Sequence, residues 1–236
     1  MARYKDSYGF GGYQLTPWVK KLLIANFAVF ILGLVAPLIT DYMGFAPDAV
    51  LWRPWTILTY AFVHGGFMHI FFNMLALFFF GPPLENRWGS REFIKYYLIC
   101  ALGGAALSFV FAFHSTVVGA SAAVYGIMLA FAMVWPDVPI YIYGIFPIKA
   151  KWLVGALAAL SFFSAFRPGV GDNTAHFAHL GGFLFGFLYI KFDKATGNPL
   201  QKLRKVFARR RLKVVKGSAT VTPMNARPTR KRDEDR

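Results

Sequence analysis

Residues 96–135 read YYLICALGGAALSFVFAFHSTVVGASAAVYGIMLAFAMVW and carry no charged side chain over forty positions. A transmembrane helix needs about 20 mostly apolar residues, so this stretch is long enough for two of them. The polar pair His114-Ser115 near its middle marks the expected break. The stretch therefore predicts two consecutive membrane spans.

Other charge-free windows lie on either side of this stretch. One covers residues 22–40, and another covers residues 54–84, which is too long for one simple helix and is divided by Gly65-Gly66. Over the whole chain 56% of the residues are apolar and only 16% are charged. Soluble domains usually carry about a quarter charged residues, so this composition excludes a water-soluble fold and excludes disorder for most of the chain.

The windows together predict an all-α, polytopic membrane protein with six transmembrane helices. We expect a cytoplasmic N-terminal segment at 1–17, a membrane domain at 18–190 and a basic, largely disordered tail at 191–236. The predicted spans cover about residues 20–40, 66–83, 94–113, 118–135, 149–166 and 173–190.

The charges predict the orientation of these spans. Of the formal net charge of +15, residues 191–236 supply +11, from fifteen Lys and Arg against four Asp and Glu. A basic balance also occurs in nucleic-acid-binding proteins, but basic residues on the cytoplasmic side are usual for membrane proteins. We therefore expect no nucleic-acid partner, two cytoplasmic termini in the cell membrane, and contact of the tail with anionic lipid.

Polar residues inside apolar spans usually mark function or helix contacts. The first such group is Gly119-Ala120-Ser121-Ala122, with Tyr125 one helical turn after Ser121. A serine with small neighbours is a candidate nucleophile that leaves room for an incoming peptide. The same small residues are also typical of close helix packing in membranes, so this group alone does not establish catalysis.

The second group, in the last span, contains His179 with Gly182 and Gly186. Glycines four residues apart let another helix backbone approach closely. If the helix of Ser121 is that partner, His179 comes within hydrogen-bond reach of the hydroxyl and acts as a base. His176 lies one turn earlier and competes for this role, and either histidine is also compatible with a packing role.

The third group contains His64, His69 and Asn73. His69 and Asn73 are four residues apart and share a helix face, where both can donate hydrogen bonds. Together with the Ser121 backbone N–H they are candidates to hold an oxyanion. No carboxylate or cysteine accompanies these histidines at a metal-ligand spacing, so we expect no metal. The single cysteine, Cys100, is interpreted as a packing residue.

The three groups together resemble the rhomboid family of intramembrane serine proteases. The family's His and His-x-x-x-Asn pattern is similar to His64, His69 and Asn73, and its Gly-x-Ser motif is similar to Gly119-Ala120-Ser121. Its Ala-His-x-x-Gly-x-x-x-Gly motif is similar to 178–186 and selects His179 over His176. The family's Glu-x-x-x-Gly-Ser turn, interpreted as structural, is similar to residues 85–90.

The resemblance implies a six-helix core with a membrane-embedded outer loop between the first two helices, and no cofactor. It implies a dyad of Ser121 as nucleophile and His179 as general base and acid, with Tyr125 packed on the histidine ring. Asp172 is seven residues before His179 and is given no catalytic role. The implied substrates are transmembrane segments of membrane proteins, cleaved near the outer face. The oligomeric state is left open.

Two positions depart from the family pattern. Ala122 follows the serine where many members have glycine, and Trp55-Thr56 stands where many have Trp-Arg, although Trp52-Arg53 lies three residues earlier. Three other functions compete with a protease. They are a catalytically inactive rhomboid-like protein that binds membrane clients, a membrane esterase with the same dyad, and a small transporter. The lack of charged residues at mid-depth counts against transport.

Overall fold

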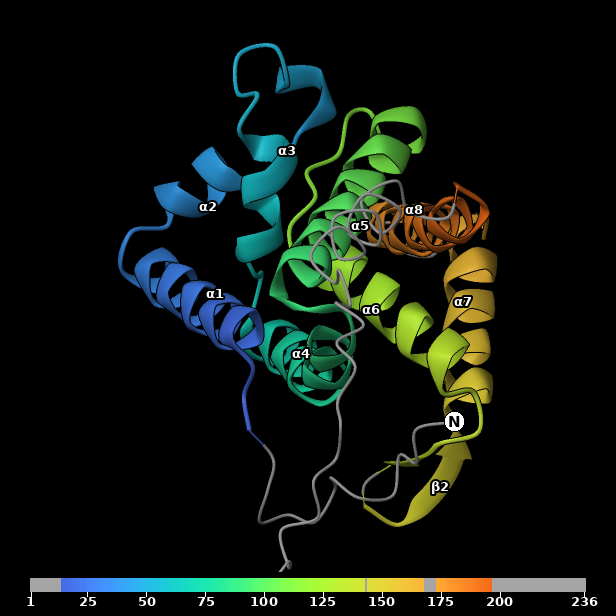
Figure 1. Ribbon diagram of the computed structural model, residues 1–236. Coiled ribbons are helices and arrows are strands. Elements are labelled where there is room, and N and C mark those ends of the chain that lie inside the picture. Colours follow the sequence, from blue (N-terminus) through green and yellow to red (C-terminus); the bar gives the residue numbers. More distant parts are fainter. Residues whose placement is uncertain (1–13, 143, 168–172, 197–236) are drawn as a thin grey trace, which may run out of the picture. The chain divides into compact units, whose positions relative to one another are not determined.

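The computed structural model describes residues 14–142, 144–167 and 173–196 of this 236-residue chain. Its segments are mostly helical and are arranged as shown in Figure 1. In chain order they are α1 (Pro17–Val35), α2 (Leu38–Met43), the 3-10 helix η2 (Pro47–Ala49), α3 (Thr56–Thr59), the 3-10 helix η3 (Tyr60–Phe62), α4 (Phe67–Trp88), α5 (Ser90–Phe111), α6 (Ser121–Val134), β1 (Pro139–Ile142), β2 (Phe146–Lys149), α7 (Ala150–Ala165) and α8 (Thr174–Thr196).

Within these described ranges, three helices are both long and apolar enough to cross a membrane: α1, α4 and α5. Two further apolar helices, α6 and α7, are shorter. These lengths and compositions agree with the predicted helical membrane protein, in which each helix satisfies its own backbone hydrogen bonds in lipid.

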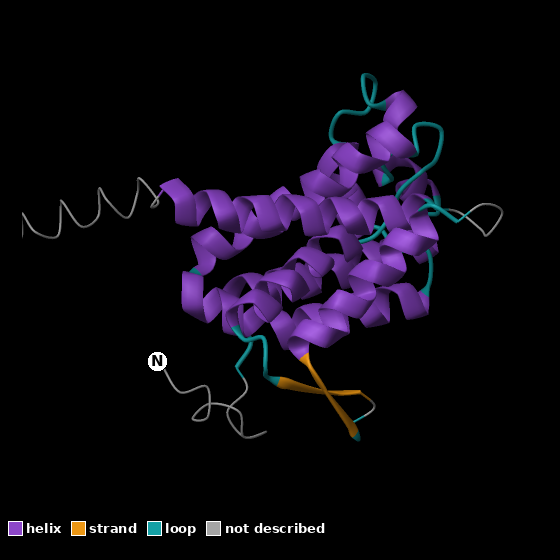
Figure 2. Ribbon diagram, turned by 90° about the vertical axis from the view of Figure 1, so that its right-hand side faces the viewer, coloured by secondary structure: helices purple, strands orange, loops and turns teal. Residues whose placement is uncertain are grey.

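The described chain is mostly helical, as expected, but it also contains one short hairpin that the sequence analysis did not predict. Strands β1 and β2 form an antiparallel hairpin in which Pro139 pairs with Lys149 and Ile142 pairs with Phe146. Figure 2 shows this hairpin, in orange, extending away from the helices. Ile140 and Ile142 are β-branched and alternate along β1, which is typical of strands. The sequence analysis left these residues between the predicted spans 118–135 and 149–166 and predicted no strand there.

Several helix ends also differ from the predicted span limits. The first helix ends at Val35 rather than near residue 40, because Pro37 follows and α2 begins separately at Leu38. Helix α4 continues to Trp88 and α8 continues to Thr196, both beyond the predicted ends. Hydropathy windows stop at the first charge, whereas a helix can extend past the apolar layer with its charged residues in water.

Helix α6 lies at the centre of the bundle and packs against α4, α5 and α7. Its contact with α8 is close because Gly182 has no side chain: a Cβ atom there would overlap the Ala122 carbonyl. Gly126 of α6 lies against buried Cys100 of α5 in the same way. Small residues therefore let these helices approach, as in other membrane bundles.

The start of α1 is held by a carboxylate from the far end of α4. Both Trp18 and Val19 donate their backbone N–H groups to Glu85, at distances of 3.0 to 3.1 Å. The Ser90 hydroxyl donates to the same carboxylate. The first N–H groups of a helix lack partners inside the helix, so Glu85 satisfies them and ties α1 to α4. We call this cluster the Glu85 anchor.

The connection between α1 and α4 is fastened to the segment 116–120 that leads into α6. Phe45 and Val117 exchange two backbone hydrogen bonds, of 3.0 and 2.8 Å. The Gly119 N–H donates to the Tyr60 carbonyl at 2.9 Å. Buried Tyr60 in turn donates its hydroxyl to Ala101 of α5. The segment that ends at Ser121 is therefore held along its length.

Candidate active site

Ser121 and His179 are in direct contact. The serine is the first residue of α6, and its Oγ lies 2.9 Å from Nε2 of His179 on α8. His176 lies edge-on to His179, with ring centroids 5.9 Å apart, and its Nδ1 is buried without a hydrogen-bond partner among the described residues. The structure thus brings His179 to Ser121, as the family pattern suggested.

Tyr125 holds the His179 ring from one side. The two rings are stacked, with centroids 4.2 Å apart and an interplanar angle of 16°. Ser161, a buried residue of α7, lies near the Tyr125 hydroxyl. A stacked ring restrains the imidazole plane. Sequence reasoning did not select Ser161, although it is a polar residue in an apolar span and the same search for such residues could have found it.

His179 receives no further hydrogen bond from the described part of the chain. Its Nδ1 is buried and has no partner there. Asp172, which the sequence analysis set aside as a third catalytic member, lies outside the described residues. The geometry described is therefore that of a serine and a histidine as a pair.

Gly119 sets the path of the chain into Ser121. Its φ is +120°, a backbone conformation that residues with side chains rarely adopt. A Cβ atom at this position would lie 2.6 Å from Nε2 of His69. The glycine thus permits both the turn before Ser121 and the approach of the His69 ring to the site.

His69 and Asn73 lie on one face near the start of α4, and the structure places His69 beside the Ser121 turn. Buried Asn73 donates one amide N–H to the His69 carbonyl at 2.8 Å, which leaves its second N–H. Ser121 opens its helix, so its own N–H has no carbonyl one turn earlier within α6. These groups are the candidate donors for an oxyanion at the site.

His64 supports the same turn from behind. Its ring lies edge-on to His69, with centroids 4.9 Å apart, and its Nε2 accepts the Ala120 N–H at 3.4 Å. Tyr60, which holds Gly119, has a comparable supporting role that the sequence analysis did not find. A tyrosine between apolar residues gives no distinguishing pattern, so only the folded chain identifies it.

The two glycines of α8 have different neighbours. Gly182 lies against Ala122 of α6, whereas a Cβ on Gly186 would meet Tyr96 and Cys100 of α5. The two glycines, which were expected to contact one helix, therefore contact two different helices, α6 and α5. Ala122 itself is buried in the contact with Gly182.

Trp55-Thr56 stands where many family members have Trp-Arg, but the connection before α3 is still well anchored. The Trp55 indole N–H donates to the Tyr42 carbonyl at 3.1 Å, and the Arg53 guanidinium donates to the Asp41 carbonyl at 3.1 Å. Thr56 bonds back to Arg53 with its hydroxyl. Arg53 and Trp55 thus both hold the end of α2.

Comparison with known proteins agrees with this architecture. The family model described as Rhomboid domain matches residues 51–194, which is more than half of the chain. "RHOMBOID-like protein 2" of Arabidopsis thaliana is 36% identical over 135 residues, covering 56% of this chain and 40% of the relative. "Rhomboid protein 1, mitochondrial" of Saccharomyces cerevisiae is 32% identical over 140 residues, covering 57% and 40%.

A parasite relative matches over a longer range. "Rhomboid-like protease 3" of Toxoplasma gondii is 30% identical over 167 residues, covering 69% of this chain and 60% of the relative. The plant and yeast matches span less than half the length of those proteins. With the family model covering α4 to α8 and the Ser121 surroundings, the chain belongs to the rhomboid family, a family of multi-pass membrane proteins.

Proposed function

We propose that this protein is an intramembrane serine endopeptidase that cleaves transmembrane segments of membrane proteins with Ser121 and His179. The observation that carries the proposal is the 2.9 Å contact between Ser121 Oγ and His179 Nε2, with Tyr125 stacked on the imidazole. Rhomboid family members are generally intramembrane serine proteases, and one relative is named a protease.

In the proposed reaction, the Ser121 hydroxyl attacks a peptide carbonyl while its proton passes to Nε2 of His179. His179 then gives that proton to the leaving amine, and water hydrolyses the acyl-enzyme in the same manner. The negative oxygen of each tetrahedral intermediate is held by His69, by the second amide N–H of Asn73 and by the Ser121 N–H. Tyr125 keeps the imidazole plane aligned, and no cofactor takes part.

The short length of α6 supports a site below the membrane surface. Its 14 residues extend for about 21 Å, whereas the apolar layer of a bilayer is about 30 Å thick. A helix that begins at Ser121 thus starts inside the apolar layer when its other end reaches the opposite surface. The extended segment 116–120 completes the crossing, and the site opens to water from the outer side.

The proposed topology has six spans, α1, α4, α5, α6, α7 and α8, in the cell membrane with both termini in the cytoplasm. The connection from residue 36 to residue 66 lies within the outer membrane layer, and the basic tail contacts anionic lipid. Cysteines introduced at Ser115 and Asn86 test the orientation, since the only native cysteine is buried. In intact cells a membrane-impermeant maleimide should label position 115 and not position 86, and the reverse result would contradict this topology.

The activity is tested with a fluorescent fluorophosphonate, which labels activated serines, on the purified protein in mild detergent. Wild type should be labelled, and both Ser121→Ala and His179→Ala should lose about 10³-fold or more of the labelling rate. The same variants should fail to cleave a transmembrane substrate in liposomes.

Two matched variants control for nonspecific damage. Ser108→Ala removes a buried hydroxyl that bonds to the Gly104 carbonyl, and His176→Ala removes the histidine one turn from His179. Both should keep the labelling. Labelling that survives Ser121→Ala would show another nucleophile, and folded wild type without labelling or cleavage would favour an inactive protein that binds membrane clients. Cleavage of esters without cleavage of peptides would favour the esterase.

A further inference from the structure

The hairpin of β1 and β2 presents apolar side chains on both of its faces. Residues 138–148 carry no charged side chain. On one face of the ribbon, Tyr141 lies opposite Pro147. The strand pairing places four aliphatic or aromatic residues on the other face: Ile140, Ile142, Phe146 and Ile148. Antiparallel strands that face water usually present polar side chains on that side, so neither face is typical of a ribbon in water.

The connection of the hairpin to α7 determines where it lies relative to the bilayer. Strand β2 ends at Lys149 and α7 begins at the next residue, Ala150, so no linker separates them. The 16 residues of α7 extend for about 24 Å, whereas the apolar layer of a bilayer is about 30 Å thick. A crossing helix of this length has its ends at or inside the edges of the apolar layer. The base of the hairpin therefore lies at the membrane surface rather than far out in water.

The residues around this base are those expected at a membrane–water boundary. Asp137 lies 3.3 Å from Lys149 and 2.9 Å from Lys151, so the charges gather at the base of the hairpin. Trp152 follows, with 67% of its surface exposed, and the Lys151 amino group lies 5.7 Å from the centroid of its ring. Tryptophan and tyrosine are enriched at membrane interfaces, where lysine side chains also reach the headgroups.

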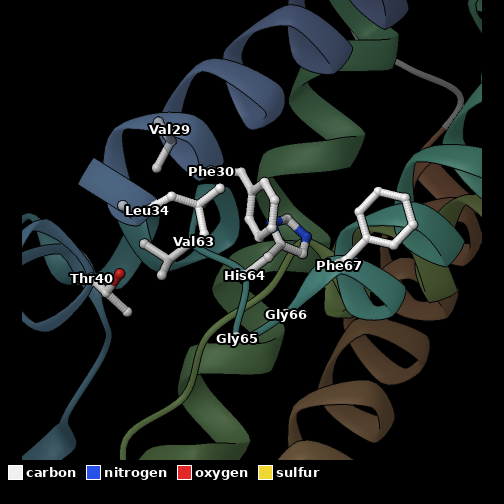
Figure 3. Close-up of a pocket in the computed structure, with 10 residues that line it drawn as sticks. Val29, Phe30, Leu34, Thr40, Val63, His64, Gly65, Gly66 and Phe67 are labelled. Atoms are coloured by element: carbon white, nitrogen blue, oxygen red, sulfur yellow. The ribbon is translucent and has the colours of Figure 1, made fainter. Parts of the chain in front are cut away.

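The apolar residues of the hairpin are as exposed as side chains on a membrane-spanning helix. Leu34 of α1, which is drawn in Figure 3, is 69% exposed on a helix long and apolar enough to cross a membrane. Ile145, at the turn of the hairpin, is 70% exposed, and Tyr141 and Phe146 are also largely exposed. A two-stranded hairpin is at best marginally stable in water. Contact with lipid removes this apolar surface from water and stabilises the hairpin.

We propose that the β1–β2 hairpin lies in the interfacial layer of the bilayer, with Tyr141, Ile145 and Phe146 inserted between the headgroups and the upper part of the acyl chains. Elements that lie on a membrane in this way are typically buried by about 5–10 Å. The partner is the lipid surface where α6 ends and α7 begins, and the hairpin fixes the depth of both helix ends. The proposal rests on the multi-pass fold and not on the proposed protease activity, nor on which side of the membrane is cytoplasmic.

The experiment measures fluorescence quenching of the full chain in phosphatidylcholine liposomes. The environment-sensitive fluorophore NBD is attached to Ile145→Cys, and the matched control is Asn86→Cys, an exposed position in the last turn of α4 on the same side of the membrane. Phosphatidylcholine with a spin label near its headgroup should quench position 145 at least about three-fold more than position 86. Iodide in the water should quench position 86 more than position 145. Leu160→Cys, within α7, gives the reference for a position in the apolar layer.

Ile145 is exposed at a turn, so its substitution should leave the fold intact, and Phe146→Cys gives a second probe of the same surface. Both probes should respond to the spin-labelled lipid. Equal iodide quenching at positions 145 and 86 would place the hairpin in water. Protection of position 145 from iodide without quenching by the spin-labelled lipid would show that protein, such as a second copy of this chain, covers it. Either result overturns the proposal, and neither depends on whether the protein cleaves a substrate.

Discussion

The two ends of α4 carry polar residues in an apolar helix, but the two sets differ in how far their hydrogen bonds are satisfied. Near the end, Glu85 accepts the N–H groups of Trp18 and Val19 and the Ser90 hydroxyl. Near the start, His69 lies beside the turn that leads into Ser121, and Asn73 follows it on the same helix face. In the same region His64 and His179 each keep a buried nitrogen without a partner in the described chain.

The difference separates two uses of a costly polar group in a membrane protein. A group whose partners are all internal holds the fold, because removing it leaves several donors unsatisfied. A group with spare bonding capacity is available to a substrate or another ligand. The same kind of residue should therefore affect stability at one end of α4 and reaction rate at the other.

The largest effect is expected where stability and reaction rate depend on the same contact. Gly182→Val places a side chain into the Ala122 carbonyl, so α8 must move away from α6 and the Ser121–His179 pair must separate. We expect a stability loss at or above the upper end of the usual overpacking range of about 1–3 kcal/mol, together with loss of fluorophosphonate labelling. Gly155→Val on α7 is the matched control, because a Cβ there meets nothing within 4 Å. Equal melting temperatures for the two variants would contradict the close α6–α8 contact.

Asn73→Ala should separate rate from stability at the start of α4. Loss of one oxyanion donor typically lowers the rate by about 10²–10³-fold. The substitution also removes the hydrogen bond from the Asn73 amide to the His69 carbonyl, but this is only a local contact within the helix. We expect substrate cleavage in liposomes to fall by that factor while the melting temperature stays close to that of wild type. A rate loss that follows a proportional loss of stability would instead give Asn73 a structural role.

Glu85→Ala should show the opposite pattern. Its removal leaves the Trp18 and Val19 N–H groups at the start of α1 without their acceptor, at a cost of about 1.5–3 kcal/mol. Thermal unfolding in detergent should show the loss, and Glu85→Gln should recover part of it because one acceptor oxygen remains. The labelling rate of the folded fraction should be unchanged.

Glu92→Ala is the control for the Glu85 variants. Glu92 also accepts two side-chain bonds, from Lys95 at 2.8 Å and from Tyr189 at 3.0 Å, but it is partly exposed. Its removal should cost less than about 1 kcal/mol. If both variants lose the same stability, the Glu85 anchor has no special importance.

The sequence was sufficient for the membrane class and for selecting the residues of the candidate site, because intramembrane polar residues are few and are easily recognised. Ser121, His179, Tyr125 and His69 come from three separate helices, and their grouping followed from depth and from the family pattern. The pairing of His179 rather than His176 with Ser121 needed that pattern, since one helical turn separates the two histidines and periodicity alone leaves both open.

Other features depend on contacts that no local pattern records. Ser161 lies near the Tyr125 hydroxyl but on another helix, and Tyr60 holds Gly119 through its backbone carbonyl. The β1–β2 hairpin was missed because its strands are only four residues long and each contains a proline, so the alternation is too short to stand out. The different neighbours of Gly182 and Gly186 follow from helix crossing, which spacing along one helix does not determine.

Substitution of Asp137 should have the smallest effect on stability. It tests whether the Glu85 anchor stabilises the fold through its buried hydrogen bonds or through its charge alone. Asp137 lies before the hairpin, 2.9 Å from Lys151 and 3.3 Å from Lys149, and it is well exposed. The hydrogen bond from Lys151, with that from Lys149, holds the pKa of Asp137 below its ordinary value of 3.8. A lowered carboxylate pKa adds stability above the ordinary value and loses it as the pH falls through the lowered one, but water screens this exposed group. Asp137→Asn should therefore unfold at the same temperature as wild type between about pH 5 and pH 8, and a clear loss there would mean that an exposed ion pair stabilises this fold as the buried Glu85 anchor does.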